Sequence, residues 1–412
     1  MLLTQGAGKW LKYSVLNLVI IAMLGVLMRY KIGFEFPYFD QKNIQHAHSH
    51  FAFAGWIAHT LYTLIYYSLN QHVFKKPKIA FDWLIPFNLV CAYGMLVSFF
   101  VQGYGPVSIL FSTCSVGVSF CFAFCYFRLN PLWKYQDPSV KWIKAALLFN
   151  VLSSVGTFLL AYMMVTKHLE QTRYLASVYF YLHFQYNGWF TMACIGLFVG
   201  LLYRSEIVLA DTVSYRLLVV ACLPAYFLST LWYQLPVSIY ALTVVAAFAQ
   251  AIGWTLFLRL IWRSRRMIQA NLSNGTLLLF LLAAFAMSIK FVLQLGSTVP
   301  EISKLAFGFR PIVIAYLHLV LLGVITIFLL GFLYAGQFFS TKLWLRIGLI
   351  LFVGGIFLNE LILLIQGIAS FSYILIPRTN EGLLFVAALM LVGLLIIVGT
   401  GFLKRKNLQE KP

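Results

Sequence analysis

The chain has 412 residues, of which 62% are hydrophobic and 10% are charged, and its mean hydropathy is +0.88. Soluble domains carry roughly 25% charged residues, so this composition excludes a soluble globular protein and indicates a polytopic protein of the lipid bilayer. The formal net charge is +19, but the basic residues are spread thinly over the connections between apolar runs. That distribution is typical of membrane topology and does not indicate a nucleic-acid-binding surface.

A bilayer-crossing helix needs about 20 apolar residues, and the sequence contains twelve runs of that kind. They lie near 13–31, 46–69, 80–102, 105–127, 141–165, 176–203, 214–233, 236–262, 274–296, 311–337, 341–368 and 381–403. No connection is long enough for a soluble domain, and we detect no convincing internal repeat. We therefore expect an all-α fold in which residues 1–412 form a single domain, a bundle of twelve transmembrane helices.

The basic residues indicate how the chain is oriented. Twelve crossings place both termini on one side, and that side receives most of the Lys and Arg residues, including those of 75–78, 128–144 and 404–411. Loops rich in Lys and Arg stay on the cytoplasmic side of a membrane. We expect a multi-pass protein of a bacterial-type inner membrane with cytoplasmic N- and C-termini.

Histidines gather at the outer ends of three apolar runs. His46, His48 and His50 open the second run, His183 lies in the sixth and His318 in the tenth. Ionisable groups inside a bilayer are costly and usually mark a functional site, and imidazole is the commonest metal ligand in proteins. Because three runs bring histidines to a similar depth, we expect a cofactor site in the outer part of the membrane.

Helical periodicity separates the three clustered histidines. His46 and His50 are four residues apart and share one helix face, whereas His48 points nearly the opposite way. Either His48 or the His46/His50 pair therefore faces the centre of the bundle, and the sequence leaves both alternatives open.

The remaining candidate groups are thiols and two buried charges. All six cysteines lie inside apolar runs, and no Cys-x-x-Cys-His motif for covalent haem attachment is present. We expect no thiol or carboxylate beside His183, so the sequence offers too few ligands there for copper. Lys290 and Glu360 lie deep in the ninth and eleventh runs and are expected either to pair with each other or to serve a proton path.

Three short motifs resemble a known superfamily. The stretch 48–56, HSHFAFAGW, resembles the HxHxxxxGW pattern in the second helix of proteins related to subunit I of haem–copper oxidases. His46-Ala47-His48 also resembles the HAHEM stretch of NnrS-type haem- and copper-containing membrane proteins. In the tenth run, AYLHLVLLG at 315–323 is similar to the oxidase pattern AHFHYVL, and in the sixth run YLHFQYNGW at 181–189 is similar to HxxxEG of nitric oxide reductases.

The resemblance implies a fold like that of oxidase subunit I and a low-spin haem b held by His48 and His318. His46 and His50 are alternative ligands, and Tyr316, at the position of the high-spin haem ligand, could hold a second haem as a phenolate. His183 matches a ligand of copper or non-haem iron.

Several expected features of a binuclear centre are missing. The histidine pair of the seventh helix has no counterpart in 214–233, and Asn187 replaces the glutamate of the sixth. Oxygen reduction of the oxidase kind is therefore not expected. Arg310 and Arg378, two of the few outer basic residues, are the candidate partners of haem propionates, although each could equally be a surface residue.

Two functions follow from these residues. The first is a haem protein for electron transfer or for nitric-oxide- or oxygen-related respiration, which implies a redox partner or further respiratory subunits. The second is a secondary transporter that uses Lys290 and Glu360, although two similar six-helix halves are not visible. A subunit of a larger respiratory assembly is a third alternative.

Overall fold

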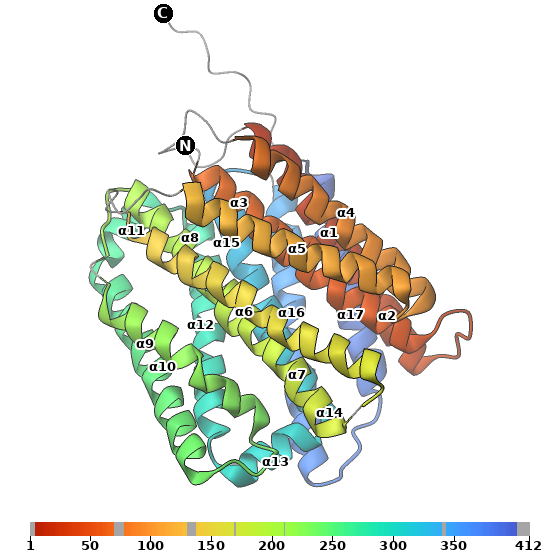
Figure 1. Ribbon diagram of the computed structural model, residues 1–412. Coiled ribbons are helices and arrows are strands. Elements are labelled where there is room, and N and C mark those ends of the chain that lie inside the picture. Colours follow the sequence, from red (N-terminus) through yellow and green to blue (C-terminus); the bar gives the residue numbers. More distant parts are fainter. Residues whose placement is uncertain are drawn as a thin grey trace, which may run out of the picture. The chain divides into compact units, whose positions relative to one another are not determined.

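The computed structural model describes residues 5–69, 78–129, 137–168, 170–209, 211–339 and 343–401, and these residues form helices joined by short connections (Figure 1). The all-α class is confirmed over this part of the chain. Some of the basic residues that indicate orientation lie outside the described residues, namely those within 70–77, 130–136 and 402–412.

Ten helices in the described ranges are long and apolar enough to cross a membrane. They are Ala7–Gly33, Ala80–Gln102, Pro106–Arg128, Ser139–Thr166, Gln171–Arg204, Val237–Arg263, Asn274–Gly296, Arg310–Ala335, Leu343–Ser370 and Thr379–Gly399. An eleventh results if the bent pair Val213–Cys222 and Pro224–Thr230, with 46° between its halves, counts as one crossing. A polytopic membrane protein is the architecture that this set of apolar helices supports.

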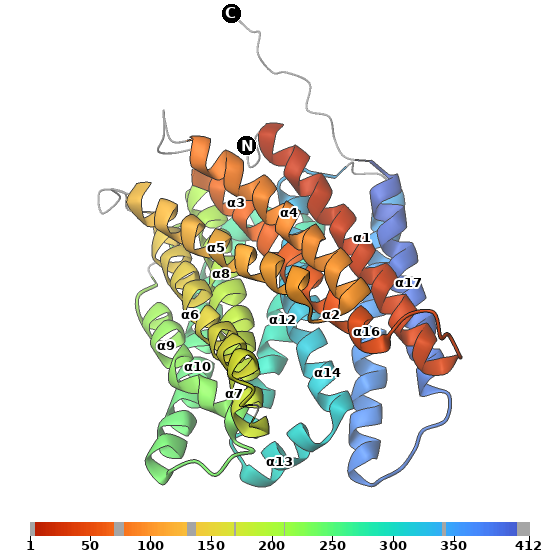
Figure 2. The ribbon, with the colours of Figure 1, turned by 45° about the vertical axis from the view of Figure 1, so that its right-hand side comes forward.

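Two compact units make up the chain, and unit one comprises residues 1–122, 329–366 and 375–412. Its elements are α1 (Gln5–Gly33), α2 (Gln41–Phe51), η1 (Ala52–Ala58), α3 (His59–Leu69), α4 (Lys78–Gln102), most of α5 (Pro106–Leu129), most of α15 (Ile327–Ala335), most of α16 (Leu343–Phe371) and α17 (Thr379–Gly399). Helix α1 packs along α17 on one side and along α2, η1 and α3 on another, as Figure 2 shows for α1 and α17. The segments α2, η1 and α3 follow one another without a break, so residues 41–69 form one continuous helix.

Unit two comprises residues 123–328 and 367–374. Its elements are α6 (Ser139–Thr166), α7 (Gln171–His183), η2 (Phe184–Phe190), α8 (Thr191–Arg204), α9 (Val213–Cys222), η3 (Pro224–Thr230), α10 (Val237–Arg263), α11 (Arg265–Asn271), α12 (Asn274–Gly296), α13 (Pro300–Gly308), α14 (Arg310–His318) and η4 (Leu319–Thr326). Helix α6 packs against α7, η2 and α8, and α10 packs against α9 and α12 (Figure 1). The run from α7 through η2 to α8 is the most enclosed crossing described, with 94% of its apolar window buried.

Candidate functional site

Three π-helical segments mark the helices that carry the candidate histidines. In the described residues η1 begins two residues after His50, η2 directly after His183, and η4 directly after His318. π-Helical turns are rare and occur frequently at functional sites, because they insert a residue and free backbone groups from the regular ladder. The local backbone therefore changes at each of the three places that the sequence singles out.

The three segments also share a sequence pattern. HFAFAGW at 50–56 and HFQYNGW at 183–189 agree at four of seven positions, and HLVLLGV at 318–324 keeps the histidine and the glycine. This pattern is local and overlaps each of the three π-helical segments.

In unit one, His48 faces α1. Its Nδ1 lies 3.1 Å from the carbonyl oxygen of Ile21, and Gly25 leaves room beside the ring, since a Cβ there would lie 3.6 Å from His48 Cε1. A carbonyl can only accept a hydrogen bond, so Nδ1 carries the proton and Nε2 keeps its lone pair. This tautomer follows from the hydrogen-bond network, and it is the arrangement that a metal-binding imidazole adopts when its second nitrogen donates to the backbone.

His46 and His50 face α4 instead. The His50 ring stacks on Phe99 with 4.2 Å between centroids, and its Nε2 lies 3.2 Å from the Tyr104 hydroxyl. The His46 ring meets Tyr104 edge-on at 4.6 Å. The prediction that His48 points away from the His46/His50 face is confirmed.

A buried polar network supports η1. Asn17 of α1 donates to the carbonyl of Gly55 at 2.6 Å and accepts from the Tyr93 hydroxyl at 2.7 Å, while Asn88 of α4 donates to the carbonyl of Ala54 at 3.2 Å. Carbonyls released by a π turn inside lipid need another donor, because no water is available to them there. The side chains of α1 and α4 therefore stabilise the π turn below His48.

In unit two, both ring nitrogens of His183 are engaged by protein groups. Nε2 lies 2.9 Å from the carbonyl oxygen of Cys222, and Asn187 Nδ2 lies 3.0 Å from Nδ1. The carbonyl requires a proton on Nε2, so Nδ1 is the acceptor and no lone pair is left for a metal. In this arrangement His183 does not fit the ligand role that the resemblance gives it.

The prediction that no thiol lies beside His183 was wrong. Cys222 Sγ lies 3.9 Å from His183 Nε2, because α9 packs against η2. These residues are 39 positions apart in the chain, and only the packing of two helices brings them together.

The two intramembrane charges lie in different units. Lys290 of α12 is 2% exposed, has its ammonium 4.1 Å from the ring centroid of Phe291, and interacts electrostatically with Cys222 and His183. Glu360 of α16 accepts a hydrogen bond from Asn359 at 3.1 Å. The proposed pairing of the lysine with the glutamate stays a prediction.

The remaining candidates lie in and before α14 and α17. His318 is the last residue of α14 and half-buried, and the Tyr316 ring lies 6.2 Å from the Tyr186 ring, also in unit two. Arg310 and Arg378 are exposed, the first at the start of α14 and the second immediately before α17. Exposure is compatible with a role for either arginine in binding propionates at the surface.

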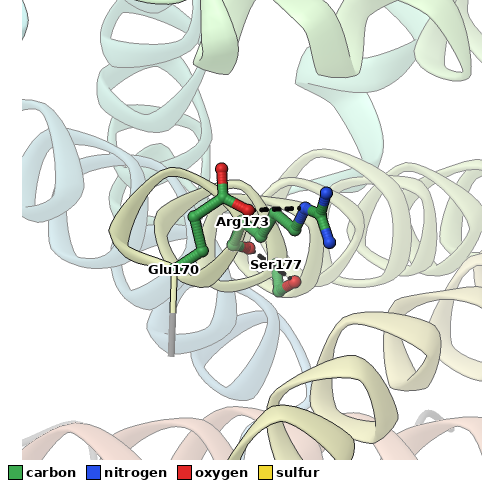
Figure 3. Close-up of polar contacts among 3 residues, drawn as sticks. All are labelled: Glu170, Arg173 and Ser177. Atoms are coloured by element: carbon green, nitrogen blue, oxygen red, sulfur yellow. Dashed lines mark hydrogen bonds and ion pairs between the residues drawn. The ribbon is translucent and has the colours of Figure 1, made fainter. Parts of the chain in front are cut away.

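Figure 3 shows the ion pair that opens α7. Arg173 Nε lies 2.8 Å from Glu170 Oε2, with side chains 78% and 55% exposed, and the Arg173 carbonyl accepts from Ser177. Exposed pairs of this kind contribute little to stability. The pair lies at the N-terminal end of the helix that continues into η2.

His59 is a buried group that the sequence did not single out. Its side chain is 0% exposed, it lies edge-on to Trp10 with 6.2 Å between centroids, and neither ring nitrogen completes a hydrogen bond in the structure. The Trp10 carbonyl is near enough to interact with it electrostatically. The available signal was its position directly after the π segment, on the same helix as His48.

Comparison of the sequence with protein-family models and with curated proteins gives no match, so the case for a function rests on the residues and contacts above.

Proposed function

We propose that this protein is a membrane-embedded b-type haem protein of a bacterial-type inner membrane, with a fold like that of haem–copper oxidase subunit I. Its task is electron transfer, or nitric-oxide- or oxygen-related respiration. The proposed bundle has twelve crossings and cytoplasmic termini. The ten apolar helices described above and the bent α9–η3 pair would supply eleven crossings. In this proposal the continuous helix at 41–69 is the twelfth.

One observation carries the haem proposal. The carbonyl of Ile21 holds the proton of His48 on Nδ1, so the Nε2 lone pair of a half-buried imidazole is available. In contrast, Nε2 of His50 already contacts the Tyr104 hydroxyl, and both nitrogens of His183 are engaged. The hydrogen bonds therefore favour His48 over His50 and His183.

His318 is proposed as the second axial ligand, with Arg310 and Arg378 as partners of the propionates. His48 and His318 share one backbone feature, since each is followed in its own helix by a π-helical segment, η1 for His48 and η4 for His318. When bound, the haem would supply one-electron chemistry tuned by its axial ligands. The chain's own part is to present the imidazoles of His48 and His318 and, through the Ile21 carbonyl, to hold the proton of His48 on Nδ1.

A reduced-minus-oxidised spectrum of the purified protein, combined with a pyridine haemochrome assay, tests the proposal. We expect a low-spin b-type signal that is lost in His48→Ala and in His318→Ala. The matched control is His168→Ala, which removes an exposed histidine whose Nδ1 contacts the Thr166 carbonyl. A colourless preparation from haem-replete cells, or haem retained in both ligand variants, would overturn the proposal.

Secondary transport is the second candidate, because one buried cation supports it. Lys290 is buried in α12 and interacts electrostatically with Cys222 and His183. Buried charges in membrane proteins mark substrate or proton pathways. Proteoliposome uptake that depends on Lys290 and Glu360, in a protein without haem, would select this function.

A further inference from the structure

A second group of ligand-type side chains lies at the outer end of α2, on the face opposite His48. His46 and His50 come from α2, and Tyr104 comes from the turn between α4 and α5. Both imidazoles meet the same phenol: the His46 ring lies 4.6 Å and the His50 ring 6.0 Å from the Tyr104 ring. Three groups that can each bind a metal therefore converge from two segments that are distant in the sequence.

Tight packing holds the turn against α2. Gly103 has φ +61°, and a Cβ at this residue would come within 2.5 Å of Asn43 Oδ1, so the backbone of the turn touches α2 closely. A positive φ and such close approach both favour glycine. On the other side the His50 ring stacks on Phe99 with an interplanar angle of 10°, which fixes its orientation.

The spacing of the histidines suits chelation. Side chains four residues apart on a helix lie about 5–6 Å apart at Cβ, and two imidazoles in this arrangement bind zinc in helical metal sites. Both His46 and His50 are half-buried rather than enclosed, and Tyr104 is 48% exposed, so coordination positions remain open to water. His46 interacts electrostatically with Lys42 and, more weakly, with Asp40.

We propose that His46, His50 and Tyr104 form a site for a divalent cation of the late first-row transition metals, with Zn²⁺ and Cu²⁺ as the best matches to imidazole ligands. No group of three or more His, Cys, Asp or Glu side chains capable of holding a metal occurs in the described residues. The third ligand here is a tyrosine oxygen, and water completes the coordination. The site is separate from the proposed haem site, because His48 lies on the opposite helix face.

Metal titration of the full-length protein tests this site. After chelator treatment, Zn²⁺ binding is measured by calorimetry, and the Cu²⁺ adduct by electron paramagnetic resonance. We expect a single Zn²⁺ per chain whose Kd rises at least tenfold in His46→Asn and in His50→Asn, and a copper signal with coupling to two nitrogens. Tyr104→Phe should weaken binding less than either histidine variant, and His168→Asn should leave it unchanged.

Haem content, measured on the same samples, separates this inference from the haem proposal. Loss of metal binding with haem unchanged supports both. Zn²⁺ affinity that is unaffected in His46→Asn and His50→Asn would overturn the metal site, whatever the haem content. Loss of haem in His50→Asn with metal affinity retained would instead assign His50 to the haem. If His50→Asn is not monodisperse in detergent, His46→Asn decides, because the His46 ring makes an edge contact with Tyr104 and a tilted contact with Phe99 but, unlike His50, does not stack on Phe99.

Discussion

Replacing Asn17 with leucine tests the support of the π turn below His48. The amide is 0% exposed, donates to the Gly55 carbonyl and accepts from the Tyr93 hydroxyl, so Asn17→Leu leaves two polar groups unpaired at nearly constant volume. Hydrogen bonds between membrane helices contribute about 0.6 kcal/mol on average and at most about 1.7 kcal/mol. Loss of both bonds should therefore lower the free energy of unfolding by about 1–3 kcal/mol.

The same change should affect the orientation of His48. A π turn carries one residue more than the α-helix, and one residue corresponds to a rotation of about 100°. If η1 returns to α-helical spacing when the Gly55 carbonyl loses its donor, α2 turns relative to α3 and His48 leaves the face that meets Ile21. If the protein binds haem through His48 as proposed, Asn17→Leu should therefore also lose most of its haem.

Equilibrium unfolding in mixed micelles measures the stability effect, and a double-mutant cycle with Tyr93→Phe isolates the 2.7 Å bond between the two side chains. We expect a coupling of about 0.6–1.7 kcal/mol. Two results together would refute the claim that this network stabilises the π turn. The effects of Asn17→Leu and Tyr93→Phe on the free energy of unfolding would be fully additive, and Asn17→Leu alone would destabilise the protein by less than about 0.3 kcal/mol. The control is Asn271→Leu, which replaces an exposed amide near the end of α11.

Three further substitutions test other parts of the structure. Gly188→Ala should destabilise unit two by about 1–3 kcal/mol, because a Cβ at this residue would lie 2.5 Å from Phe149 Cβ. An unchanged unfolding midpoint would mean that α6 and η2 are not packed this closely. His59→Leu should leave the free energy of unfolding unchanged or raise it, because the imidazole is buried without completing a hydrogen bond. A decrease in the free energy of unfolding of more than about 1 kcal/mol would show that the ring has a hydrogen-bond partner. Arg173→Ala should change stability by less than about 0.5 kcal/mol, because its pair with Glu170 is exposed, and a larger loss in the same assay would contradict that reading.

Local periodicity and composition were sufficient for several features of this protein. The all-helical class follows from long apolar runs, since a backbone in lipid must satisfy its own hydrogen bonds and the helix does so within one segment. The opposite orientation of His48 and the His46/His50 pair follows from the helical repeat alone. These predictions depend only on residues that are close together in the sequence.

Contacts between distant residues could be decided only by the tertiary structure. The thiol of Cys222 reaches His183, and Asn17 and Tyr93 meet beneath the π turn, because separate helices pack there. The π turns themselves depend on such partners, since an inserted residue is stable in an apolar helix only when other side chains satisfy the freed carbonyls. The sequence thus determined which histidines share a helix face, while packing determined which of their nitrogens remain available.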